Sequence, residues 1–140
     1  MSSSWLTVSA VLIAAFVLAF VAGKMMTRRA GRLQATTEAP GVDTGALGLS
    51  STGPTVLHFS AVWCGPCAGV RRVVDQVCAE LPAVAHVEID MDANPEAARR
   101  LSVLSLPTTF VFDADGRQHY RASGVPTVAD LRTALEPLLA

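Results

Sequence analysis

A run of apolar residues near the N-terminus constrains this chain more than any other feature. No charged side chain occurs between Ser2 and Gly23, and residues 5–22 read WLTVSAVLIAAFVLAFVA. About 20 residues of helix span roughly 30 Å, which is the thickness of the hydrocarbon core of a bilayer. A buried core helix would show a polar face, which this run lacks. The pattern therefore predicts one transmembrane helix over residues 5–23, after a short tail of residues 1–4.

Positive charge follows the apolar run and predicts its orientation. Lys24, Arg28, Arg29 and Arg32 come after the run, and the first acidic residue is Glu38. A cleavable signal peptide carries its basic residues before the apolar stretch, so a cleaved signal is the weaker alternative. Loops rich in Lys and Arg tend to stay cytoplasmic. The sequence therefore predicts a single-pass protein of the cell membrane with a cytoplasmic domain, and an extracytoplasmic domain is the alternative.

The remaining residues suit one modest domain behind a linker. Residues 24–52 are expected to form a basic juxtamembrane segment and a linker rich in Gly, Thr, Ser, Ala and Pro, and residues 53–140 a compact domain. The formal net charge of −1 provides no strong field that would attract nucleic acid. Three cysteines are too few for a scaffold held by disulfides.

Within residues 53–140, apolar periodicity alternates between strand and helix patterns. Apolar residues of the first helix recur at helical spacing from Val70 to Leu81, and Asn94 with Pro95 marks the start of the second. The predicted strands cover residues 55–61, 83–90, 108–113 and 117–123, and the predicted helices cover residues 70–81, 95–101 and 127–139. This order, β-α-β-α-β-β-α, predicts a mixed sheet with helices on both faces.

Two cysteines stand three positions apart in the stretch FSAVWCGPCAGV. A strand precedes them and a helix follows, so Cys64 is expected at a helix N-terminus. Unpaired N–H groups and the positive end of the helix dipole stabilise a thiolate there and lower the thiol pKa. Cys67 lies within about one helical turn, close enough to attack a mixed disulfide at Cys64, and Pro66 suits a first turn. The pattern predicts a reversible dithiol/disulfide pair.

Zinc is the competing interpretation of the same pair. A structural zinc site needs four ligands, usually from two such pairs, and this sequence has one pair. Cys78 falls on the expected buried face of the helix, where a thiol behaves as a small apolar residue. The histidines show no metal-type spacing, so no metal site is predicted. An inert pair is the third interpretation.

Several motifs in combination resemble those of the thioredoxin family. They are WCGPC after a buried strand, SLPTTF about forty residues later, and the stretches FDADGR and ASGVPTVADLRTAL, all in the order and at the spacing of that family. The resemblance covers residues 53–140. It implies a thioredoxin-like fold preceded by one N-terminal transmembrane helix. The first strand and helix of the family are expected to be missing, or reduced to a remnant in residues 40–52.

The resemblance also implies roles around the cysteines. Cys64 would be the attacking nucleophile and Cys67 the resolving thiol of a redox-active Cys64–Cys67 disulfide. Pro107 would be a cis-proline beside them, whose neighbours offer backbone groups to an extended substrate segment. Trp63 would flank the disulfide, and Gly124 would leave room for a bound substrate chain. The motif and substrate-binding residues implied in this way are Trp63, Gly65, Pro66, Pro107, Thr108 and Gly124.

Three positions depart from the pattern of the family. His58 stands where thioredoxins generally carry a buried Asp that helps to move the proton of the resolving thiol. Glu88 stands where a Lys often pairs with that Asp, and Arg72 replaces a proline that kinks the helix. A histidine of ordinary pKa can accept a proton, so His58 is a candidate proton acceptor for Cys67, with a neutral structural histidine as the alternative.

The sequence thus predicts a membrane-tethered thiol-disulfide oxidoreductase that reduces protein disulfides through its CGPC pair. No bound cofactor is expected, and the absence of a nucleotide-binding glycine motif implies an external donor, either a thioredoxin reductase or a membrane dithiol carrier. Gly65-Pro66 between the cysteines resembles reducing thioredoxins more than the oxidants, which usually carry a His there. The alternatives are an extracytoplasmic exchange protein acting on exported proteins and a non-catalytic CxxC binding or metal-carrier module.

Overall fold

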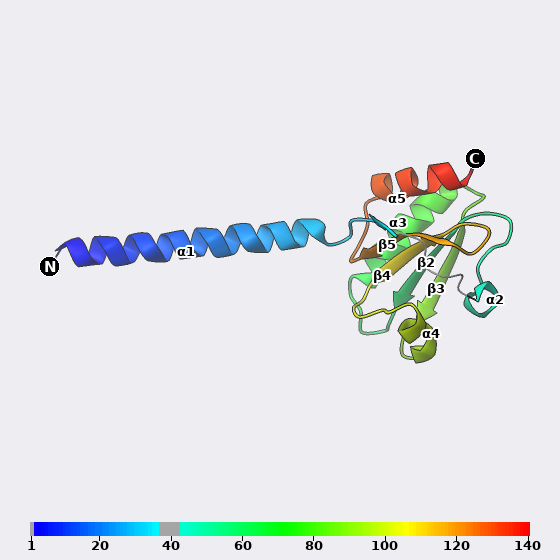
Figure 1. Ribbon diagram of the computed structural model, residues 1–140, viewed down its shortest axis with the longest axis horizontal. Coiled ribbons are helices and arrows are strands. Elements are labelled where there is room, and N and C mark those ends of the chain that lie inside the picture. Colours follow the sequence, from blue (N-terminus) through cyan, green and yellow to red (C-terminus); the bar gives the residue numbers. More distant parts are fainter. Residues whose placement is uncertain (1, 37–42) are drawn as a thin grey trace.

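A single long helix, α1 (Ser2–Arg29), extends from a small α/β domain in the computed structural model (Figure 1). The structure describes residues 2–36 and 43–140, so Met1 of the expected tail and residues 37–42 of the expected linker lie outside it. Residues Ser4–Arg28 are long and apolar enough to cross a membrane, and none of the tested window is buried against the domain. A signal sequence would meet the same criterion, so α1 is a candidate membrane span.

The domain is built on a five-stranded sheet of order β1-β5-β4-β2-β3. The strands are β1 (Gln34–Ala35), β2 (Thr55–Ser60), β3 (Ala85–Asp90), β4 (Thr108–Phe112) and β5 (Gln118–Ser123). Only β2 and β3 run parallel, and the other described pairs are antiparallel. The carboxyl ends of β2 and β5 and the amino end of β4 therefore meet at one end of the sheet, where Phe59 pairs with Thr108 and Thr108 with Ser123.

Helices cover both faces of this sheet. They are α2 (Thr44–Leu47), α3 (Cys67–Glu80), α4 (Pro95–Arg100) and α5 (Val128–Leu135), followed by a 3-10 turn at Glu136–Leu138. Figure 1 shows α3 and α5 on one side of the sheet and α2 with α4 toward the other. The prediction of a mixed sheet flanked by helices is confirmed.

Alternation along β2 divides the core into two layers. Val56 faces α3 and packs with Val70, Val74 and Val77, whose spacing of three and four residues puts them on one helical stripe. The intervening residue Leu57 faces the opposite side. There it packs with Phe59, Phe110, Phe112, Leu47 and Leu101.

The segment expected to be a linker is partly structured. β1 lies within it and pairs with β5 in antiparallel fashion, Gln34 opposite Arg121 and Ala35 opposite Tyr120. The remnant expected in residues 40–52 is represented, among the described residues, by the short helix α2, whose Leu47 is buried. β1 therefore borders β5, and β3 has a described partner strand only on its β2 side.

Candidate functional site

The paired cysteines lie between the end of β2 and the start of α3. Cys64 and Cys67 form a disulfide with their Cα atoms 5.6 Å apart. The N–H of Cys64 donates to the carbonyl of Ala61 at 3.0 Å, which turns the chain sharply after the strand. Pro66 is the N-cap of α3, so the helix begins at Cys67 and Cys64 lies just before its first turn. This places Cys64 three residues before the helix, outside the N-terminal position that the sequence indicates, and its carbonyl accepts the N–H of Cys67 at 3.3 Å.

The two sulfur-bearing residues differ in their access to solvent. Cys64 is partly exposed, whereas Cys67 is completely buried. The Sγ atom of Cys67 lies 4.0 Å from the carbonyl oxygen of Phe59 in the neighbouring strand. A thiol that arrives from solution can therefore reach Cys64 but not Cys67. This asymmetry is the one that a nucleophile and a resolving thiol require.

A cis-proline stands beside β2 at the same end of the sheet. The peptide bond between Leu106 and Pro107 is cis, and the N–H of Gly124 donates to the carbonyl of Pro107 at 2.9 Å. Thr108 is buried, and its hydroxyl donates to the carbonyl of Ser105 at 2.6 Å. The register between β2, β4 and β5 brings these residues to the strand end that precedes the cysteines.

Trp63, Gly65 and Pro66 are exposed around the disulfide. The indole of Trp63 is 65% exposed, and its Nε1–H donates to a carboxylate oxygen of Asp92 at 2.9 Å. A Cβ atom added at Gly65 would meet nothing within 4 Å. The rim of the site is therefore open to a partner on the Trp63 side.

The space over Gly124 differs from the sequence expectation. Gly124 has φ +92°, and a Cβ atom there would lie 3.0 Å from the backbone nitrogen of Gly31. The N–H of Gly31 donates to the carbonyl of Ser123 at 2.5 Å. Ala30 and Gly31, which follow α1, thus lie against Gly124, where the sequence predicts room for a bound substrate chain.

His58 is buried in a polar cluster on the face of the sheet that α3 covers. Its Nδ1 atom lies 3.0 Å from Nε2 of His86, and its Nε2 atom lies 3.7 Å from a carboxylate oxygen of Glu88. The guanidinium of Arg71 holds Glu88 with donor–acceptor distances of 2.8 and 2.9 Å from Nε. His86 in turn faces Asp75 at 3.6 Å.

This environment lowers the pKa values of both His58 and Glu88, so both groups are deprotonated at neutral pH. Burial lowers the pKa of His58 to about 4, with Glu88 opposing the shift, so the imidazole is neutral at neutral pH. Hydrogen bonds from Arg71 lower the pKa of Glu88 to about 2. The cluster therefore holds a neutral histidine beside a carboxylate that is already neutralised by an arginine.

Sequence reasoning missed His86, Arg71 and Gly31 as neighbours of the site. His86 could have been found by placing the two parallel strands in register, since Val56 pairs with His86 and His58 with Glu88. Arg71 lies one helical turn after Cys67, on the face of α3 that the sequence pattern predicts to be exposed to solvent. No local pattern places Gly31 beside Gly124.

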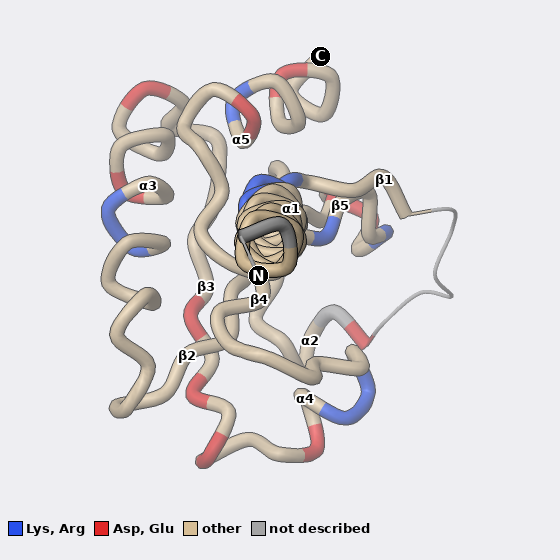
Figure 2. Tube along the Cα trace, turned by 90° about the vertical axis from the view of Figure 1, so that its left-hand side faces the viewer, with Lys and Arg blue, Asp and Glu red and all other residues tan. Residues whose placement is uncertain are grey.

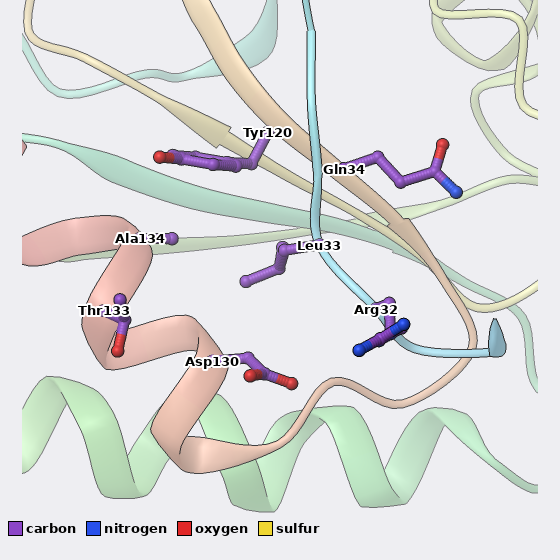
Figure 3. Close-up of a pocket in the computed structure, with 7 residues that line it drawn as sticks. All are labelled: Arg32, Leu33, Gln34, Tyr120, Asp130, Thr133 and Ala134. Atoms are coloured by element: carbon purple, nitrogen blue, oxygen red, sulfur yellow. The ribbon is translucent and has the colours of Figure 1, made fainter. Parts of the chain in front are cut away.

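The described residues outside the disulfide offer no second redox or metal centre. Within residues 2–36 and 43–140, no three His, Cys, Asp or Glu side chains form a group that could hold a metal ion. Cys78 is a free thiol packed at the edge of the α3 core, and burial raises its pKa. A hollow of about 570 Å³ lies between β1, β5 and α5, away from the cysteines (Figure 3).

Comparisons with known proteins agree with this geometry. The family model described as Thioredoxin matches residues 48–137. The chain is 38% identical to a thioredoxin of Mycolicibacterium smegmatis over 94 residues, which cover 65% of this chain and 83% of that protein. A thioredoxin of Chlamydia trachomatis is 37% identical over 75 residues, covering 54% and 72%. Among solved structures, a mutant thioredoxin from Halobacterium salinarum superposes with a TM-score of 0.61 at 30% identity, covering 71% and 88%.

Proposed function

The chain belongs to the thioredoxin family, and on that premise we propose that it is a membrane-tethered reductase of protein disulfides. It is a thiol-disulfide oxidoreductase whose redox-active group is the Cys64–Cys67 disulfide. Its family implies protein disulfides as substrates and a reductase as electron donor. The observation that carries the proposal is the unequal access of the two cysteines, because one sulfur is open to a substrate and the other is kept from solvent.

In the proposed reaction the reduced protein passes two electrons to a substrate disulfide. The Cys64 thiolate attacks one substrate sulfur, forms a mixed disulfide and releases the other substrate sulfur as a thiolate. Cys67 then loses its proton and attacks the Sγ atom of Cys64. This step restores the Cys64–Cys67 disulfide and releases the second substrate thiol. An external donor, a thioredoxin reductase or a membrane dithiol carrier, reduces the disulfide again.

The residues around the cysteines receive their roles in this proposal from the resemblance and from their positions. Pro107 and its neighbour Thr108 border the groove in which an extended substrate segment would lie. Trp63 forms an exposed wall beside Cys64. His58 is retained as a candidate acceptor for the proton of Cys67, and its low pKa limits how strongly it can act.

The membrane tether and its direction belong to the proposal as well. The length and apolarity of α1 support a span, and the basic residues that follow it favour a cytoplasmic domain. Reporter fusions at the C-terminus would test the side. A reporter active only outside the cytoplasm would replace this assignment with the extracytoplasmic alternative.

Reduction of insulin by the full chain in lipid vesicles, with a dithiol donor, tests the activity. We expect turnover with the natural sequence and a return to the uncatalysed rate in Cys64→Ser, because the nucleophile is lost. Cys67→Ser should instead accumulate a mixed disulfide at Cys64. Cys78→Ser is the matched control, since it removes a thiol that takes no part, and should keep the turnover. Equal rates for the natural chain and Cys64→Ser would favour a non-catalytic binding module.

A further inference from the structure

The helix α1 joins the domain at the end of the sheet that carries the disulfide. β5 ends at Ser123, whose carbonyl accepts the N–H of Gly31 at 2.5 Å. The next residue, Gly124, donates to the carbonyl of Pro107. Figure 1 shows α1 leaving the domain from this end. The hairpin turn between β4 and β5 lies at the opposite end.

The joint between α1 and the sheet is short and packed. Only residues 30–33 separate the end of α1 from β1. Leu33 packs against the core layer under α3 and α5, and in Figure 3 its side chain points toward α5. Gly31 has φ +84°, and a Cβ atom there would lie 2.1 Å from the carbonyl oxygen of Val125. The described part of the juxtamembrane segment therefore clamps the domain to α1.

Exposed apolar side chains lie close in sequence to the disulfide and to the cis-proline. Val62 and Leu104 are 94% and 93% exposed, and Trp63 is 65% exposed. Val62 and Trp63 directly precede Cys64, and Leu104 precedes the cis-proline by three residues. Solvent-exposed apolar residues that gather at one place indicate a contact surface. These positions follow β2 or precede β4, at the end of the sheet at which Gly31 contacts Ser123.

Basic residues also lie at the end of the sheet where α1 joins the domain. Figure 2 looks along α1 toward the domain and shows Lys and Arg gathered at the base of the helix. Arg32 and Arg121 line a hollow of about 450 Å³ together with Met26 and Gly124. Cations beside apolar side chains suit the headgroup region of a membrane, where anionic lipids attract Lys and Arg.

We propose that the end of the domain that carries the Cys64–Cys67 disulfide and Pro107, the catalytic end, faces the bilayer. Its substrates are then disulfides of membrane proteins at the membrane surface. This rests on the proposed function, in which α1 spans the membrane. If the span ends at Gly23, residues 24–29 add about 9 Å of helix and the four-residue joint at most about 14 Å. The disulfide is thereby held near the headgroups, against apolar partner segments that contact Val62, Trp63 and Leu104.

The two tryptophans of the chain provide a direct test in lipid vesicles. In the full chain with Trp5→Phe, Trp63 is the only tryptophan and reports the catalytic end. In a second chain with Trp5→Phe, Trp63→Phe and Ala114→Trp, the tryptophan sits in the exposed hairpin turn at the far end. Since β4 separates the two positions by about 17 Å, we expect lipids with headgroup nitroxides to quench Trp63 at least about twofold more strongly. Equal quenching, or stronger quenching at position 114, would overturn the proposal.

A glycine substitution tests whether the packed connection at Gly31 sets the orientation of the domain. Gly31→Ala in the Trp5→Phe chain forces a Cβ atom against Val125 and should lower the quenching of Trp63 as the domain detaches. Gly48→Ala is the matched control, because Gly48 also has a positive φ but a Cβ atom there meets nothing within 4 Å. Quenching that is unchanged by Gly31→Ala would show that the joint does not set the orientation.

Two measurements on the same vesicles separate this inference from the proposed function. Flotation of the chain with the vesicles reports the membrane span, and insulin reduction by the Trp5→Phe chain reports the oxidoreductase. If the chain floats and reduces insulin while position 114 is quenched as strongly as Trp63, only the orientation is wrong. If the chain does not float, the membrane tether and the orientation are both wrong.

Discussion

At the scale of single residues, the surroundings of the buried His58 set how strongly its imidazole can bind a proton. His86 occupies the Nδ1 side of His58, and the Glu88 carboxylate faces its Nε2 side. The pKa of about 4 makes His58 a weak base, so accepting a proton from a thiol of ordinary pKa, about 8.5, is uphill by between four and five pKa units. The imidazole of His58 is therefore neutral at neutral pH, and its role as an acceptor for the proton of Cys67 stays a prediction.

Release of a trapped mixed disulfide measures the remaining contribution of His58 to proton transfer. We expect His58→Gln to slow release from Cys64 by less than about tenfold, below the typical range for a general base, because the imidazole binds a proton so weakly. The measurement is the rate of thiol release after single-turnover loading of Cys64. His119→Gln, at a partly exposed histidine of β5, serves as control. A loss above about a hundredfold would make His58 the principal acceptor.

The same pKa predicts a pH-dependent stability. In the unfolded chain His58 has its ordinary pKa of 6.5, and in the folded protein the pKa is about 4. Between these values the unfolded state binds the additional proton, so the free energy of unfolding falls as the pH falls from about 6.5 to about 4, by roughly 3 kcal/mol in total. Urea unfolding at several pH values would measure the slope. His58→Gln should flatten it, and a slope equal to that of the natural chain would contradict the assignment.

At the scale of elements, α5 begins at a side-chain cap that can be removed singly. The hydroxyl oxygen of Thr127 accepts the N–H of Asp130 at 3.1 Å. We expect Thr127→Ala to lower the free energy of unfolding by about 1 kcal/mol. The same change at the exposed Thr133 within α5 should have a smaller effect of either sign. Denaturant unfolding of both variants measures these changes. Equal losses in the free energy of unfolding would show that the hydrogen bond of the Thr127 cap does not stabilise the protein.

The helices and strands with a repeating apolar pattern could be predicted from the sequence. The connection between α1 and β1 through residues 30–33 could not. The stripe of Val70, Val74 and Val77 and the apolar run of β2 each repeat over enough residues to identify a helix and a strand. β1 has two residues and exists only because β5 offers it an edge. The disulfide pair followed from local spacing, whereas the contact of His58 with His86 depends on the register of two strands far apart in sequence.

At the scale of the whole molecule, the candidate membrane helix joins the fold through an edge strand of the sheet. The strand that follows α1 adds to β5, at the opposite edge of the sheet from β3. The residues that follow α1 thus enter the fold as an edge strand, and the N–H of Gly31 donates to the carbonyl of Ser123 at the end of β5. In the proposed membrane-tethered arrangement, this attachment confines the disulfide and its membrane substrates to one surface.

Confinement to a shared surface predicts a large gain in rate for membrane substrates. A single-span peptide with a short disulfide loop beside the bilayer would be reconstituted with the protein in the same vesicles or in separate vesicles. Because tethering raises the effective concentration, we expect reduction in shared vesicles to be at least about a hundredfold faster. Soluble insulin can reach the protein in either arrangement. It should therefore be reduced at equal rates in the shared and the separate vesicles, and it controls for the amount of active protein. Equal rates for the membrane peptide in the two arrangements would mean that α1 does not confine the domain, and the helix would then have to be explained by targeting alone.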